Sequence, residues 1–148
     1  MTVNTAYATE NEIARQRLSR NTARLTAEDF NRLLPNGWTI ATKLTHLAFW
    51  DMYNLSCIEE WERSGFVASR VNIDAINEAV RTLSRAIPND SVIQMVRDAA
   101  EAIDRKVASM PPELATAIEA GGYSRILHRA LHRSEHLDQI EKALRPSP

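Results

Sequence analysis

The sequence predicts an all-α protein, a four-helix bundle in a single domain. Apolar residues recur at three- and four-residue spacing in four long stretches, which is typical of amphipathic helices. No stretch alternates apolar and polar residues as a half-buried strand would. The chain has 148 residues, 44% hydrophobic and 25% charged, which is enough for one ordinary globular core. We therefore expect residues 1–148 to form one helical domain.

The first two long helices are predicted over residues 9–25 and 40–64. An apolar stripe that includes Leu18 marks the first of them. The second starts after Thr39, because threonine is a frequent N-cap residue. It ends before Gly65, because glycine tolerates the backbone conformation that closes a helix.

The connection between the second and third long helices sets the predicted topology. Residues 65–90 contain a short amphipathic helix that ends before Pro88. The third long helix follows after a cap among residues 89–91 and is closed by residues 110–112. The fourth is expected from Ser124 to about residue 144, with only a short turn between these two helices. The connection is long enough to run back along the bundle, so the second and third long helices can lie parallel. This predicts an up-down-down-up bundle with one long crossover.

Three of the 4 histidines lie on the predicted fourth helix at i, i+4 spacing: His128, His132 and His136. An adjacent pair can reach one metal ion, but the outer two lie about 12 Å apart at 1.5 Å per residue. At about 100° per residue, the centre of the apolar stripe lies roughly 70° from His136, 110° from His132 and 150° from His128. His132 and His136 are therefore the expected pair. His128 is expected to face outward beside Glu135 and Gln139.

The fourth histidine, His46, lies at the edge of the wide apolar face of the second helix, one turn before Trp50. Such a histidine is more often a core residue than a ligand, and spacing alone assigns it no role. Two imidazoles are an incomplete site, because catalytic metal sites usually have three protein ligands. Cys57 is the only cysteine, which excludes an internal disulfide, and we interpret it as a small buried hydrophobic residue.

Several short motifs resemble the DinB-like superfamily of four-helix metalloproteins, which includes the N-terminal domain of mycothiol-dependent maleylpyruvate isomerase. They are Trp38 before the second helix, the run His46-Leu47-Ala48-Phe49-Trp50-Asp51, and the pair His132 and His136 followed by Leu137 and Ile140. The resemblance covers nearly the whole chain. It implies a DinB-like bundle and a divalent metal ion held by three histidines, which here are His46, His132 and His136. It gives no role to His128.

The resemblance also implies a chemistry. Three neutral imidazoles suit zinc, nickel, iron or copper, which spacing does not separate, and we favour zinc or nickel, followed by iron. Several relatives are thiol-dependent transferases or isomerases, so a low-molecular-weight thiol and a small electrophilic substrate are expected. One alternative is a non-catalytic protein that binds or sequesters a small molecule or toxin, and another is a bundle whose histidines are structural. No residue is assigned as catalytic. Five residues are candidate neighbours of the metal ligands, although Asp51 and Glu135 fit solvated helix surfaces equally well: Thr42, Asp51, Tyr53, Glu135 and Gln139.

Composition argues against several other classes of protein. The formal net charge is −1, from 18 basic and 19 acidic residues, which gives no electrostatic reason to expect binding to nucleic acid or a membrane surface. No apolar run approaches the roughly 18 residues that span a bilayer, and no signal-peptide core is present, so a cytoplasmic protein is expected. The second helix carries more apolar surface than one neighbouring pair covers. Proteins of the DinB-like superfamily commonly form dimers. Together with this apolar surface, the resemblance predicts a homodimer.

Overall fold

The computed structural model describes residues 3–146. In this range the only secondary structure besides helix is one isolated bridge between Leu33 and Thr39, so the predicted all-α class is confirmed. The helices in chain order are α1 (Val3–Ala23), η1 (Asp29–Asn31), α2 (Ile40–Ser64), α3 (Ile73–Ser84), α4 (Asn89–Ser109), α5 (Pro112–Ala120), η2 (Ser124–Ile126) and α6 (Arg129–Leu144).

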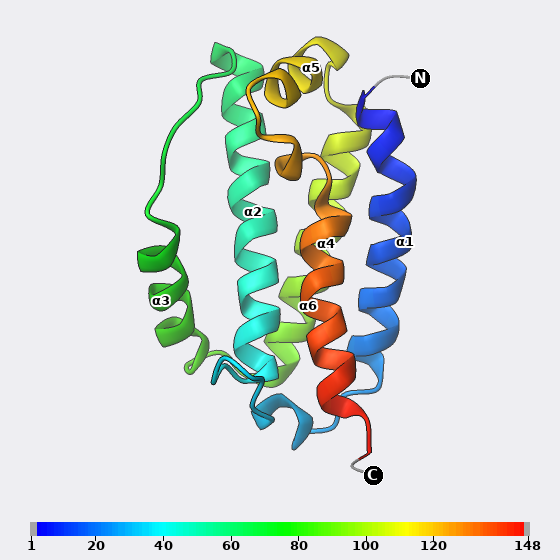
Figure 1. The fold of residues 1–148 in the computed structure, drawn as a ribbon, viewed down its shortest axis with the longest axis vertical. Coiled ribbons are helices and arrows are strands. Elements are labelled where there is room, and N and C mark those ends of the chain that lie inside the picture. Colours follow the sequence, from blue (N-terminus) through cyan, green and yellow to red (C-terminus); the bar gives the residue numbers. More distant parts are fainter. Residues whose placement is uncertain (1–2, 147–148) are drawn as a thin grey trace.

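Four long helices, α1, α2, α4 and α6, lie along the long axis of the molecule, and α3 packs outside α2 (Figure 1). Helices α2 and α4 run in the same direction, because Lys106 near the end of α4 contacts Glu62 near the end of α2 at 3.0 Å. Helix α1 runs the opposite way, because Asn4 at its start donates to the carbonyl of Met110 just after α4, at 3.2 Å. Helix α6 runs in the direction of α1 (Figure 1). The segment 65–88, which includes α3, returns the chain from the end of α2 to the start of α4.

Both ends of α2 follow the signals in the sequence. The side-chain oxygen of Thr39 accepts a hydrogen bond from the backbone N–H of Thr42 at 3.1 Å, which satisfies one free donor of the first turn. Gly65 has a φ of 85°, a backbone conformation that glycine adopts without a steric penalty. Its N–H bonds to the carbonyl of Trp61 and closes the helix. The predicted bounds of this helix are confirmed.

The fourth long helix starts later than predicted. Residues 124–126 form a separate 3-10 turn, and α6 begins only at Arg129. The cause is Asn11 of α1, which is fully buried. Its side chain donates to the carbonyl of Leu127 at 2.8 Å and accepts from the N–H of Ala130 at 2.9 Å. The carboxamide thereby binds backbone groups that a continuous helix would pair internally.

Two other elements also differ from their predictions. Helix α1 spans Val3–Ala23, so it begins earlier and ends sooner than residues 9–25. Residues 112–120, where only a turn was expected, form the helix α5. Proline at the first position favours this helix, since the missing N–H has no helical partner there and the fixed φ suits the first turn.

A buried polar layer divides the core into two apolar clusters. One cluster surrounds Leu47 at the α1–α2–α4–α6 crossing, and the other surrounds Ile103 toward α5. On α2, for example, Asp51 lies between Ala48 of the first cluster and Ile58 of the second. The layer consists of Asn11, Asp51, Asp104, Arg129 and Arg133, each no more than 8% exposed. Every helix of the four-helix core contributes to it, so it ties the bundle together at the level of the histidines.

Some apolar surface remains on the outer side of the bundle. Met52 of α2 and Leu83 of α3 are 47% and 66% exposed. The predicted homodimer would cover such residues, and it stays a prediction. Among residues 3–146, no helix is both long and apolar enough to cross a bilayer.

Candidate metal centre

The fold brings His46, His132 and His136 together. One nitrogen from each ring can be chosen so that all three lie within 4.8 Å of one another. The Nε2 atoms of His46 and His132 are 3.0 Å apart, and the His136 ring centroid lies 4.8 Å from that of His46 and 4.7 Å from that of His132. Nitrogens that share one zinc ion at about 2.0–2.1 Å lie roughly 3–4 Å apart. The three histidines are thus close enough to bind a metal ion.

Aromatic residues near and within α2 hold His46 in this group. Trp38, in the loop before α2, packs edge-on against the imidazole at a centroid distance of 5.3 Å. Trp50, one turn further along α2, lies at 6.5 Å. His46 itself is only 6% exposed. The position of His46 in the group agrees with the role that the sequence resemblance implied.

His128 lies away from the three converging histidines. Its ring stacks on Tyr7 of α1 at a centroid distance of 4.6 Å, and its Nε2 contacts the carboxylate of Glu10. The prediction that His128 points outward along the fourth helix is therefore wrong. Because α6 begins at Arg129, His128 precedes the helix and turns toward α1. The choice of His132 and His136 as the converging pair nevertheless agrees with the structure.

All three converging rings are neutral at physiological pH. Burial lowers the pKa of His46 to about 3, and the Lys43 charge and the charge that His136 would carry if protonated act in the same direction. Burial and Lys43 lower the pKa of His136 to about 4. Burial and the adjacent Arg129 guanidinium also hold the pKa of His132 well below its usual value. Neutral imidazole is the form that binds metal ions, so protonation does not compete at neutral pH.

The hydrogen bonds of the three imidazole rings show which ring nitrogens are free to bind a metal ion and which are not. Nδ1 of His46 and Nδ1 of His136 are buried without a partner among the described residues, an arrangement that a bound ion or water can relieve. Arg129 Nη2 donates to His132 Nδ1 at 2.9 Å, since a guanidinium only donates. Neutral His132 therefore carries its proton on Nε2 and donates it to His46. Coordination through His132 Nε2 requires this proton to move to Nδ1 and Arg129 to withdraw.

Behind His132, a buried ion-pair network holds Arg129 in place. Asp51 accepts from Arg129 Nε at 2.8 Å and from Arg133 Nη2 at 3.3 Å. Arg133 also donates to both carboxylate oxygens of Asp104, at 2.7 and 2.8 Å. Asp51 is therefore no solvated surface charge, and it acts on His132 through Arg129. Buried charges of this kind persist only when they are paired.

The other candidate neighbours of the metal ligands have separate surroundings. Glu135 is exposed and pairs with Arg125 at 3.0 Å, so the surface interpretation holds for it. Gln139 acts on His136, where it opposes part of the pKa lowering. Thr42 bonds to Ser84 of α3 at 2.8 Å and joins two helices. Tyr53 lines the pocket described next.

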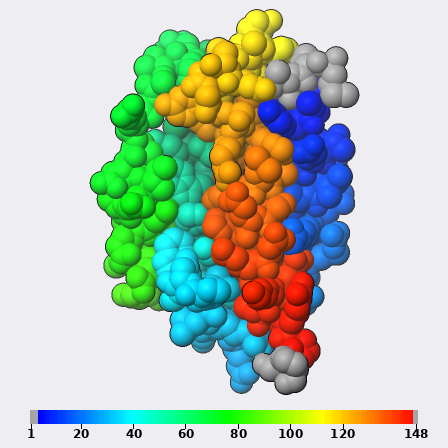
Figure 2. All heavy atoms as spheres, viewed as in Figure 1, coloured from blue at the N-terminus to red at the C-terminus, as the bar shows by residue number. Residues whose placement is uncertain are grey.

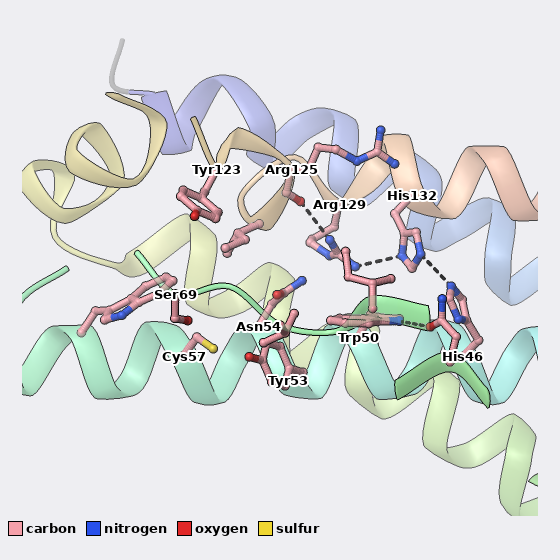
Figure 3. Close-up of a pocket in the computed structure, with 15 residues that line it drawn as sticks. His46, Trp50, Tyr53, Asn54, Cys57, Ser69, Tyr123, Arg125, Arg129 and His132 are labelled. Atoms are coloured by element: carbon pink, nitrogen blue, oxygen red, sulfur yellow. Dashed lines mark hydrogen bonds between the residues drawn. The ribbon is translucent and has the colours of Figure 1, made fainter. Parts of the chain in front are cut away.

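A pocket of about 370 Å³ opens beside the histidines. Figure 2 shows its mouth as a furrow with α2 at its floor, between the 65–77 segment and the stretch of η2 and α6. His46 and His132 line one end, with Trp50 beside them (Figure 3). Trp61 is a further apolar lining residue. Cys57 lies half-buried in the pocket wall, so its interpretation as a core residue is wrong in part, and burial raises the pKa of its thiol.

The buried arginines and the pocket were not identified from the sequence. One signal in the sequence could have indicated that Arg133 is buried. At about 100° per residue, Arg133 falls within roughly 30° of the centre of the apolar stripe on α6. A charge in that position is expected to have a buried partner. Asp51 and Asp104 lie among the core residues of α2 and α4.

The fold and the site together define a helical bundle with a three-histidine group capable of holding a metal ion beside an apolar pocket. No protein-family model, curated protein or solved structure matches this chain. The DinB-like resemblance therefore rests on the sequence motifs.

We expect the metal-free protein to lose stability as the pH falls from about 6.5 toward 4. The three rings have lower pKa values in the folded state than the roughly 6.5 of unfolded histidine, so the unfolded state binds more protons in this range. Three protons correspond to a slope of up to about 4 kcal/mol per pH unit. Urea denaturation at a series of pH values measures the slope. His46→Gln should reduce it by about one proton, and an unchanged slope in this variant would contradict the assignment.

Proposed function

We propose that the protein binds one divalent metal ion through His46, His132 and His136 and acts on a small electrophile with the help of a low-molecular-weight thiol. The convergence of three neutral imidazoles is the observation that carries this proposal. A site of three nitrogen ligands suits zinc or nickel, and also iron, and leaves further coordination positions for other molecules. When bound, such an ion lowers the pKa of a coordinated water or thiol.

The DinB-like assignment is part of the same proposal. Its support is the position of the histidines, one on the second long helix and two on the last. The parallel direction of α2 and α4, connected by a segment with one short helix, is also consistent with it. A homodimer formed through α2 and its neighbour α3 completes the proposal. Light scattering that shows a monomer at micromolar and higher concentrations would count against the dimer.

The residues of the pocket would bind and shield the reactants. His46 and His132 form part of the pocket surface, so a molecule in the pocket lies next to the proposed ion. Trp50 and Trp61 offer apolar surface that excludes water from this space. Arg129, fixed by Asp51, places a positive charge at the same end.

One observation favours the alternative of a non-catalytic binding or sequestering protein. Among the described residues, the pocket is lined by no carboxylate that would serve as an acid or base. Of its other titratable groups, Tyr53 and Cys57 have raised pKa values, chiefly because of burial, and stay neutral near pH 7. Turnover would then depend on the proposed ion and the thiol alone.

Cobalt(II)-loaded protein separates these alternatives. Titration with N-acetylcysteine is expected to produce a sulfur-to-cobalt absorption band with a stoichiometry of one, because the thiol occupies an open coordination position. Conjugation of the thiol to 1-chloro-2,4-dinitrobenzene should then be faster than with the His46→Ala variant. A band without faster conjugation would support the sequestering alternative. The absence of a band with cobalt bound would contradict the role of the thiol.

A further inference from the structure

We infer that the pocket beside the histidines binds a flat, apolar small molecule that carries a carboxylate, recognised by Arg125 and Asn54. This names a substrate class for the proposed function, and it rests on that function only in assigning the molecule as the substrate. Four features of the pocket support it: its apolar walls, its arginines, the absence of opposing charge, and an amide in the wall that has no partner among the described residues.

The walls select the body of the ligand. Trp50, Tyr53 and Trp61 of α2 line the pocket, as do Tyr123 and Ile126 from the stretch before α6. Aromatic walls favour flat apolar groups, which stack on ring faces or meet their edges. A volume of about 370 Å³ is in the range of small-molecule sites and has room for a fused two-ring system.

The arginines select the charge. Arg129 uses three of its five N–H groups, toward Asp51, the carbonyl of Arg125, and His132. Arg125 has one ionic partner, Glu135, and both side chains are 55% exposed. Such an exposed ion pair contributes little to stability, so Arg125 can exchange Glu135 for an anionic ligand. No carboxylate among residues 3–146 lines the pocket, so an anionic ligand meets no repulsion from its walls. A guanidinium in this setting favours a carboxylate, which can accept two parallel hydrogen bonds.

Asn54 gives support for a polar ligand that is independent of the arginines. Its side chain is only 6% exposed, and it has no hydrogen-bond partner among the described residues. Figure 3 shows it pointing from α2 into the space that faces Arg129. The amide atoms of Asn54 are not sealed in the core but open to the pocket, so they are free to bond to a ligand there. An amide N–H can donate to a carboxylate oxygen held at the arginine end.

The test compares 2-naphthoate with 2-naphthamide by isothermal titration calorimetry. The two probes share one flat ring system and differ in charge. With metal-free protein, we expect 2-naphthoate to bind with a stoichiometry of one and at least tenfold more tightly than the amide. Arg125→Gln and Asn54→Asp should each weaken naphthoate binding at least tenfold, because one removes the cation and the other introduces a like charge. Arg105→Gln, which alters an exposed arginine of α4 outside the pocket, should leave it unchanged.

Equal affinity for the two probes would overturn the inference, as would the absence of saturable binding. Equal affinities of the Arg125→Gln and Arg105→Gln variants for naphthoate would also overturn it. Arg125 is exposed, so its replacement tests the inference without disturbing the core. The experiment is independent of the metal, because metal-free protein is used. His136→Ala, which alters a residue outside the pocket lining, should keep naphthoate binding while it abolishes the proposed metal binding.

Discussion

His132→Ala is expected to abolish stoichiometric zinc binding, whereas His128→Ala retains it. The His132 ring lies 5.1 Å from that of His46 and 4.7 Å from that of His136 between centroids, and its Nε2 is 3.0 Å from Nε2 of His46. His128 is held instead against Tyr7 and Glu10 of α1. Because loss of residues that merely support a metal ligand weakens affinity by about 10–100-fold, loss of the ligand itself should cost roughly 100-fold or more. Metal analysis of protein purified without a histidine tag, followed by calorimetric titration with zinc, measures both effects.

The remaining histidine variants decide which rings take part. His46→Ala and His136→Ala should lose the ion as His132→Ala does. Loss of zinc in His128→Ala together with retention in His136→Ala would mean that the wrong pair was chosen. Retention in all four variants would remove the site and leave a bundle whose histidines are structural.

Local signals in the sequence predicted local features of the fold well. The start of α2 after Thr39 and its end at Gly65 depend on the capping preferences of these residues alone. The pairing of His132 and His136 depends on helical spacing, which is also local. His46 is 86 positions away in sequence, and only the resemblance to a family linked it to that pair.

Features that depend on distant partners were missed for a physical reason. The start of α6 is decided by Asn11, whose carboxamide pairs with backbone groups more than 110 positions away. Helical periodicity carries no information about such a partner, so the fourth helix was predicted too long and His128 was placed on the wrong side. The direction of Arg129 toward His132 likewise depends on Asp51 of another helix.

The buried ion-pair network links the stability of the bundle to the candidate site. Arg133 is fully buried and donates to Asp51, to Asp104 and to the backbone carbonyls of Asn11 and Ala100. Its positive charge compensates the buried carboxylates of Asp51 and Asp104. Buried charges are strongly destabilising when a partner is removed. Burial already raises the pKa of Asp104, which Arg133 opposes. Removal of the guanidinium would therefore leave two carboxylates in the core with less compensation.

Arg133→Met is accordingly expected to lower the free energy of unfolding by about 3–5 kcal/mol, as measured by urea denaturation at pH 7. Arg105→Met, at an exposed arginine of α4, is the matched control and should change it by less than about 0.5 kcal/mol. If unpaired carboxylates cause the loss, adding Asp104→Leu to Arg133→Met should restore part of the stability, because one uncompensated charge is removed. A double variant whose loss equals the sum of the two single losses would show that the two side chains act independently and would contradict this account of the polar layer.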